Sequence, residues 1–509
     1  MAHKIREVYI VHHSHTDVGY TDLQEQVIYN QANNIRRAVE LIADGLEKGT
    51  NQKGLKWNCE TWYCVEQFLK VATKEEKKTF FDLVKKNSIG LSANYLNFND
   101  LADCEYLTEK IHEMQEVCAE EGVTVKTAMF ADINGISMGQ RDAMLANGVE
   151  FLYTNIHTHH GMYPLYQNQK PYFWENEDGK RLLVWSGEHY NLGNVLGIVF
   201  NKNVNFMTEN YFGKAQGDVA GPLEKLYSNL TASMEEYEEN GYPYDFYITS
   251  VSGVFSDNAP INPAIADTVA LFNEKYGEEV TMRMVTLQEL YDLIRDKVAD
   301  APVYRGAIND WWGNGVGSTP YAVKHYKEAV RLNRICDRLE EKTGVHNAEL
   351  VKAYGDNSLL YAEHTWGHSA TVTNPYDTMV TNLDMRKNSY ASKAHEAAAM
   401  RKNEQCHLLG DILRYYNLSG KVKAVSTSHE KRVFPVEFYV ETMSLPAVKV
   451  TDDKTNEVME VQLSAHPRGV LVSFLAEFEP MEEKIFTYEE QPAPAHTLFT
   501  RTAWVGAER

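Results

Sequence analysis

Three histidines and two aspartates crowd the stretch VHHSHTDVGYTD, residues 11–22, which overlaps the end of an apolar run, EVYIVHH. In an extended chain alternate side chains share a side, so we expect His13, His15 and Asp17 to point the same way. An imidazole and a carboxylate two positions apart at a strand end form a natural pair of ligands for zinc or a similar divalent ion. The alternative is a solvated polar loop whose histidines cap backbone groups.

Two further carboxylates follow apolar runs in the same manner. Asp132 comes two residues after TAMF, and Asp257 lies in the segment ITSVSGVFSDNAP. Either aspartate alone is equally well explained as a helix N-cap. If both lie at one edge of a sheet, they provide the pair of carboxyl groups that glycoside hydrolysis requires. One attacks the sugar or activates water, and the other protonates the leaving oxygen.

A second histidine-bearing segment, LLYAEHTWGHSATVTNP, contains His364 and His368. The helical pattern there breaks around Gly367, which indicates a helix end presented to a cleft, although core histidines with one hydrogen bond each are the alternative. In YTNIHTHHGMY another predicted strand ends with residues that could contact substrate or hold a second metal: Asn155, His157, His159 and His160.

The surrounding pattern predicts the elements that must position these residues. Strand-like runs at 7–13, 122–130, 149–156, 181–187 and 244–251 alternate with helical segments, which is typical of a parallel α/β sheet or barrel. One helix is expected to start with Thr21 or Asp22 as N-cap, and another with the capping box of Thr286 and Glu289. After about residue 315 three or so helices follow, and then alternating β-branched and polar residues predict antiparallel strands.

Composition sets limits on partner and compartment. The chain has 509 residues, a net charge of -21, 30 Tyr and 8 Trp. The negative charge argues against nucleic-acid and anionic-membrane partners. No signal-peptide pattern and no membrane-span pattern is visible, and the six cysteines are scattered, so we expect a cytoplasmic protein, with homo-oligomers left open.

HHSHTDVGY resembles the HSHxDxGW signature of glycoside hydrolase family 38, the class II α-mannosidases, and the order of the later residues fits over roughly residues 5–415. The resemblance implies a seven-stranded parallel β/α barrel (1–300), a three-helix bundle (301–418) that contributes to the active site, and a short or truncated antiparallel β domain (419–509). Tyr20 stands where the family has Trp, and EHTWGH replaces its more usual HD pairing.

Carried over by position, the resemblance implies one Zn²⁺ per chain, or another divalent metal, with four ligands: His15, Asp17, Asp132 and His364, with His368 as the fallback. Asp132 would also be the nucleophile and Asp257 the general acid/base, with retention of configuration and carboxyl groups about 5–5.5 Å apart. The candidate substrate-binding residues are Tyr20, Asn155, His157, Trp311, Trp312 and His368.

The expected function is therefore a zinc-dependent retaining glycosidase of α-mannosidase type, acting on a carbohydrate through a glycosyl-aspartate. One alternative is a metal-dependent carbohydrate deacetylase, which would release acetate rather than a sugar. The other is a non-catalytic sugar-binding protein, which the presence of both Asp132 and Asp257 argues against.

Overall fold

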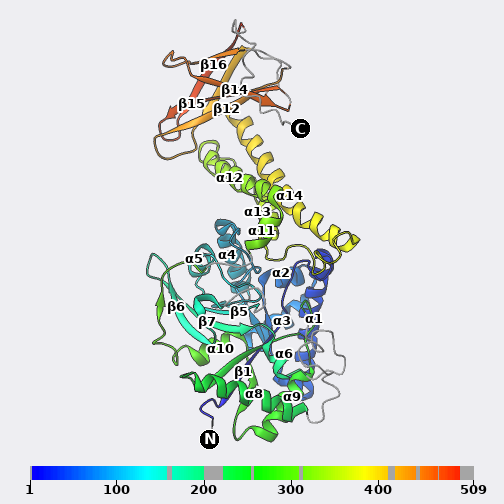
Figure 1. Ribbon diagram of the computed structural model, residues 1–509. Coiled ribbons are helices and arrows are strands. Elements are labelled where there is room, and N and C mark those ends of the chain that lie inside the picture. The colour runs from blue at the N-terminus through cyan, green and yellow to red at the C-terminus, as the bar shows by residue number, and fades with distance from the viewer. Residues whose placement is uncertain are drawn as a thin grey trace, which may run out of the picture. The chain divides into compact units, whose positions relative to one another are not determined.

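The structure is a computed structural model that describes residues 3–157, 163–199, 222–253, 257–308, 313–410, 419–442, 447–467 and 469–492. The chain divides into two compact units: the first unit contains Met1–Tyr326 and Gly355–Ala394, and the second unit contains Lys327–Tyr354 and His395–Arg509. The fold is mixed α/β, with a helical region and antiparallel sheets towards the C-terminus (Figure 1).

Within its described residues, the first unit contains ten strands: β1 (Glu7–His13), β2 (Trp57–Cys59), β3 (Ile89–Leu91), β4 (Thr127–Phe130), β5 (Phe151–Ile156), β6 (Lys170–Glu175), β7 (Arg181–His189), β8 (Phe246–Ser252), β9 (Thr281–Met284) and β10 (Val303–Tyr304). Its helices are α1 (Gln24–Lys48), α2 (Trp62–Val71), α3 (Lys74–Lys85), α4 (Cys104–Glu120), α5 (Met138–Ala146), α6 (Leu192–Leu196), α8 (Pro222–Glu239), α9 (Ala264–Tyr276), α10 (Leu287–Ile294) and α11 (Asn314–Ser318), with the short 3-10 helices η1 (Asn51–Gly54) and η2 (Pro164–Tyr166).

Most strand pairs of the first unit are parallel. β1 lies between β8 and β9, β2 pairs with β3, and β5 lies between β4 and β7, all in parallel; β6 runs antiparallel to β7. Strands β1 and β8 are almost entirely buried, as expected for apolar runs of a parallel sheet. The described strands belong to separate hydrogen-bonded sheets, so closure into a seven-stranded barrel stays a prediction.

The register of β1 and β8 matters for the site. His13 pairs with Ser252, so the carboxyl ends of the two strands lie side by side. The loops beyond them are joined by hydrogen bonds from Asn258 N to His15 O (2.8 Å) and from His15 N to Ser252 Oγ (3.0 Å). Residues that follow β1 and residues that follow β8 are therefore held against each other.

Helix starts test two sequence predictions. The capping box of Thr286 and Glu289 is confirmed at the start of α10. The N-cap prediction for the first helix is wrong: α1 has Leu23 at this position, without a side-chain cap. Thr21 instead accepts a hydrogen bond from Asn258 Nδ2 (2.9 Å), which ties this turn to the loop after β8.

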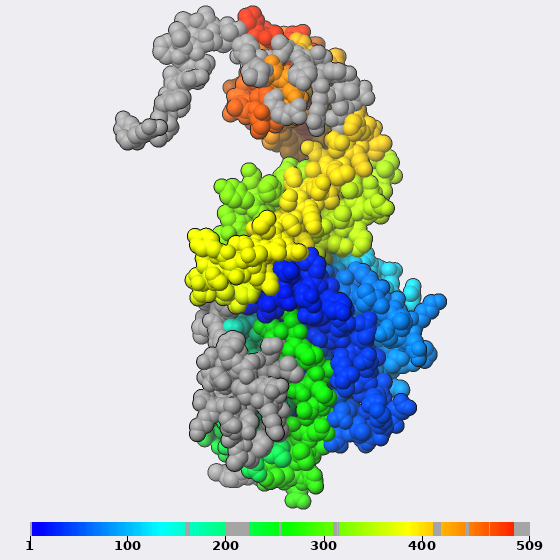
Figure 2. Space-filling model, turned by 90° about the vertical axis from the view of Figure 1, so that its right-hand side faces the viewer, coloured from blue at the N-terminus to red at the C-terminus, as the bar shows by residue number. Residues whose placement is uncertain are grey.

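The helical region contains α12 (Pro320–Thr343), α13 (Ala348–Ala362) and α14 (Thr378–Leu409). The early turns of α14 lie against the start of α1 (Figure 2), where Gln24 Nε2 donates to Leu383 O (3.3 Å) and Arg386 pairs with Glu25. This contact fixes the segment between α13 and α14 close to the loop that follows β1.

The described part of the second unit contains six antiparallel strands: β11 (Ser419–Val425), β12 (Arg432–Val440), β13 (Ala447–Asp452), β14 (Val461–His466), β15 (Gly469–Phe478) and β16 (Glu483–Gln491). They form two three-stranded sheets, in the orders β11-β16-β13 and β12-β15-β14, around a core that includes Val450, Phe474 and Phe486. No helix within the described ranges is both long and apolar enough to span a membrane.

Candidate metal centre

The candidate site lies where parallel strands end. His15 and Asp17 follow β1, Glu60 directly follows β2, Asp132 follows β4, and Asp257 follows β8. Carboxyl ends of parallel strands share one edge of a sheet, which is the usual place of an active site in α/β proteins. Parallel pairing brings together the residues that follow β1 and β8, whereas β2 and β4 belong to other sheets of the first unit.

Four buried side chains form a compact cluster: His15, Asp17, Asp132 and His364 each place one ligand atom so that all four atoms lie within 4.8 Å of one another. Asp17 Oδ1 lies 3.2 Å from Nε2 of His15 and 3.3 Å from Nε2 of His364. Asp132 Oδ2 lies 3.6 Å and 3.1 Å from the same two nitrogens.

These distances fit a shared metal ion. Donor atoms that each lie about 2.1 Å from one zinc ion are separated by no more than about 4.2 Å, and the four separations given above lie within that limit. Two imidazoles and two carboxylates form a mixed N/O donor set that suits zinc. Within the part of the chain that the structure describes, His15 Nε2 makes no hydrogen bond, although it faces both carboxylates. The cluster can therefore hold a divalent metal.

The charge state of the cluster follows from its contacts. Burial lowers the pKa of His15, but the charges of Glu60 and Asp17 outweigh burial and raise this pKa well above its ordinary value. Burial raises the pKa of Asp132, but the nearby imidazoles of His15 and His364 outweigh burial and keep this pKa well below its usual range. Asp132 is thus an ionised carboxylate.

Local structure explains how two of the ligands reach the cluster. Helix α13 ends at Ala362, earlier than the break predicted at Gly367, and His364 N then donates to Asn97 O (2.9 Å). This backbone bond fixes His364 beside the segment that follows β3. Asp132 has a φ of 74°, a left-handed conformation that aspartate tolerates better than most residues and that is frequent at functional sites.

Asp257 lies beside the cluster. Its Oδ1 accepts a hydrogen bond of 3.0 Å from the hydroxyl of Tyr190, whose ring centroid is 4.7 Å from that of His15. Burial, followed by the charge of Asp17, raises the pKa of Asp257 to about 7, and the hydrogen bond from Tyr190 opposes this shift. A large fraction of Asp257 therefore carries its proton at neutral pH, in contrast to Asp132.

The predicted substrate-binding residues Tyr20, Asn155 and His157 differ in their burial and in their contacts. Burial and then the charges of Asp17 and Asp132 raise the pKa of Tyr20 to about 12, so the Tyr20 hydroxyl is neutral near the cluster. The His157 ring lies 6.3 Å from that of Tyr190, while Asn155 is buried and donates to Ser250 Oγ (3.1 Å).

His368 does not belong to the metal cluster; it bridges to Tyr20 through the backbone. Four further predicted residues lie outside the described residues: Trp311, Trp312, His159 and His160.

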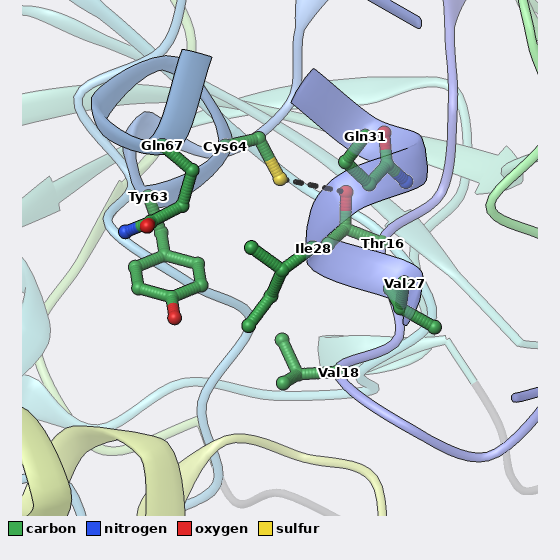
Figure 3. A pocket seen from close by; sticks show the side chains of 8 residues that line it. All are labelled: Thr16, Val18, Val27, Ile28, Gln31, Tyr63, Cys64 and Gln67. Carbon is green, nitrogen blue, oxygen red and sulfur yellow. Dashed lines mark hydrogen bonds between the residues drawn. The ribbon is translucent and has the colours of Figure 1, made fainter. Parts of the chain in front are cut away.

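The strand end after β1 has two faces. His15 and Asp17 face the metal cluster, whereas Thr16 and Val18 line a narrow pocket between α1 and α2 that is too small for a water molecule (Figure 3). Thr16 Oγ1 lies 3.7 Å from Sγ of Cys64 in this pocket. The alternation predicted from extended backbone is thus confirmed for His15 and Asp17. His13 has another role, since its ring contacts Glu60 and the carbonyl of Tyr190.

Sequence reasoning missed four buried residues that contact the site: Glu60, Tyr190, Glu363 and Lys387. Glu60 could have been found, because it follows an apolar run in the same way as Asp132. Glu363 lies next to His364 in the sequence, but only the fold shows its contacts with His364 and Lys387.

Residues 6–307 match the family model "Glycosyl hydrolases family 38 N-terminal domain". Two Enterococcus faecalis structures are similar to this chain in fold. An alpha-mannosidase from strain V583 has a TM-score of 0.64 and 14% identity, covering 96% of this chain and 57% of its own. A protein in glycosyl hydrolase family 38 has a TM-score of 0.58 and 13% identity, covering 97% of this chain and 55% of its own.

This chain thus spans little more than half the length of those two proteins. No curated protein sequence shows significant similarity to it. The family model, however, extends over more than half of the 509 residues and includes three of the four clustered residues. The chain belongs to glycosyl hydrolase family 38.

Proposed function

We propose that this protein is a zinc-dependent retaining glycosidase that cleaves α-mannoside-like substrates. The observation that carries this proposal is an arrangement of buried side chains: Asp132 belongs to the cluster with His15, Asp17 and His364, and Asp257 lies beside this cluster, hydrogen-bonded to Tyr190. The surroundings hold the pKa of Asp132 well below its usual range and raise that of Asp257 to about 7. An ionised nucleophile beside a protonated acid is the pair that retaining hydrolysis requires.

In the first step Asp132 attacks the anomeric carbon and forms a glycosyl ester, while Asp257 gives its proton to the departing glycosidic oxygen. In the second step the Asp257 carboxylate takes a proton from water. The water oxygen then replaces the Asp132 carboxylate at the anomeric carbon, which releases the sugar and restores both residues. Two inversions at one carbon give net retention.

His15, Asp17, Asp132 and His364 would hold the zinc ion. When bound, zinc supplies Lewis-acid interactions with sugar hydroxyls. The residues themselves provide the remaining requirements: Tyr190 orients Asp257, and the two imidazoles keep Asp132 charged. The α-mannoside preference is supported by the similar fold of the Enterococcus faecalis alpha-mannosidase.

The test is to trap the intermediate. The protein is incubated with an activated fluorinated glycosyl fluoride of the manno series, digested, and examined by mass spectrometry. We expect one sugar ester on the peptide that contains Asp132, and none with Asp132→Asn. Release of acetate from acetylated sugars without glycosidic cleavage would indicate a deacetylase, and sugar binding without turnover would indicate a binding protein.

A further inference from the structure

Each imidazole of the metal cluster has a buried glutamate behind it. His15 turns Nε2 towards Asp17 and Asp132 and has its Nδ1 3.0 Å from Oε1 of Glu60. His364 is placed similarly, with Nε2 towards the same two aspartates and Nδ1 in an ion-pair contact of 2.8 Å with Oε1 of Glu363. The two glutamate side chains are 1% and 0% exposed, so water does not compete for these contacts.

Glu60 is fixed at both oxygens. Its Oε1 also accepts hydrogen bonds from Thr16 N (3.1 Å) and Asn97 Nδ2 (2.7 Å). Its Oε2 lies 2.5 Å from Nδ1 of His13, whose Nε2 donates to the carbonyl of Tyr190 (3.1 Å). Because a carbonyl oxygen can only accept, Nε2 of His13 is the donor in that bond. The carboxylate cannot rotate away from His15 without breaking several contacts.

Glu363 is fixed in the same way by other residues. Its Oε2 accepts from Lys387 Nζ (3.1 Å), Thr365 N (3.1 Å) and Thr365 Oγ1 (2.5 Å). Lys387 is itself buried and donates to the carbonyls of Leu360 (3.0 Å) and Glu363 (2.8 Å). Each glutamate therefore lies between an imidazole of the cluster and a second nitrogen-bearing side chain, which is His13 for Glu60 and Lys387 for Glu363.

Such buried charge is a poor way to stabilise a fold, because the desolvation of each ion offsets much of the attraction. It does serve histidines that bind a metal. A carboxylate at Nδ1–H fixes the tautomer, leaves the lone pair on Nε2, and makes the ring a stronger ligand. Without that partner the imidazole could rotate or carry its proton on the wrong nitrogen.

We infer that Glu60 and Glu363 are positioning residues for the metal ion, acting through His15 and His364 respectively. This inference rests on the metal centre of the proposed function. It predicts that each glutamate controls metal affinity without touching the metal. The two glutamates come from separate segments of the chain.

The experiment measures Zn²⁺ affinity of the full chain by competition with a chromophoric chelator. Glu60→Gln and Glu363→Gln keep the side-chain shape but remove the charge, and we expect each to weaken zinc binding by about 10–100-fold. Glu188→Gln is the matched control, because Glu188 is also buried but is bound by Tyr237 and Tyr247. Its affinity should equal that of the wild type.

A second readout separates positioning from mere structural support. Co²⁺ replaces zinc, and its visible absorption bands report ligand geometry; we expect them to change in both Gln variants and not in Glu188→Gln. A lower melting temperature with unchanged affinity and spectrum would overturn the inference. If a Gln variant does not fold, the Asp variant at that position is used instead. Aspartate keeps the charge but places it further from the imidazole, and we expect the same weakening of zinc binding.

The outcomes also separate this inference from the proposed function. Normal metal affinity in the variants of an active, metal-dependent glycosidase would refute the positioning role alone. Weakened affinity in variants of a protein that cleaves no glycoside would refute the glycosidase and leave the positioning role intact. A wild type that binds no zinc would refute both.

Discussion

The hydroxyl of Tyr190 donates a hydrogen bond of 3.0 Å to Oδ1 of Asp257, while its ring packs against that of His15 at a centroid distance of 4.7 Å. One side chain thus joins the proposed acid to the metal cluster. Burial raises the pKa of Asp257 to about 7, and the Tyr190 hydrogen bond counteracts part of that shift because it stabilises the charged carboxylate.

Tyr190→Phe should move the alkaline limb of the activity profile to higher pH. Loss of the donated hydrogen bond destabilises the ionised form of Asp257. Its pKa therefore rises, and the acid stays protonated up to a higher pH. A hydrogen bond to a charged group contributes about 1.5 kcal/mol, which corresponds to a shift of about one pH unit. The check is a profile of kcat/KM against pH; an unchanged or lowered limb would contradict this role.

Asp257→Asn should slow turnover most when the leaving group is poor. An alkoxide departs only with a proton, whereas an activated aryl oxide departs without one, so we expect about 10²–10⁴-fold loss on the first and much less on the second. The alkaline limb near pH 7 should also disappear. Zinc content serves as the control and should not change. Equal loss on both substrates would argue against an acid/base role.

Chelation should abolish activity, and one zinc per chain should restore it. Metal binding should also strengthen as pH rises. The pKa of His15 and that of His364 are both raised, since nearby carboxylates outweigh burial, so the metal-free imidazoles carry protons that zinc must displace. Each displaced proton makes affinity rise by up to about tenfold per pH unit.

Calorimetry in two buffers of different protonation enthalpy counts those protons. Affinity that does not depend on pH, or full activity in excess chelator, would refute the metal centre. His364→Ala supplies the matched loss-of-ligand variant, and His368→Ala is its control, because His368 lies outside the cluster.

Glu188→Gln should make the protein less sensitive to alkaline pH. Burial raises the pKa of Glu188 from 4.5 to about 8. The folded protein therefore keeps this carboxyl neutral where the unfolded chain has ionised it, so its contribution to stability is full below about pH 4.5 and is lost as pH rises towards 8. The variant should match the wild type near pH 5 and be more stable at pH 9, by on the order of 2–4 kcal/mol. Urea unfolding at both pH values checks this; an equal pH dependence would contradict it.

The sequence by itself determined the strand-end positions of His15, Asp17, Asp132 and Asp257, because strand ends followed by polar residues are local features. The same signal was present at Glu60 and was overlooked. Local rules also failed at the start of α1, where Thr21 and Asp22 look like N-caps. Thr21 binds Asn258 instead, a contact that only the neighbouring loop provides.

Only the tertiary structure decided which histidine joins the cluster and what lies behind each imidazole. His364 and His368 are four residues apart and chemically identical, yet only His364 is fixed by Asn97 beside the strand ends. Glu363 and Lys387 likewise become partners of the site through the packing of α13 and α14. Spacing along the chain specifies which side chains lie on the same face of a strand or helix. The packing of distant strands and helices against one another then determines which of these faces are in contact.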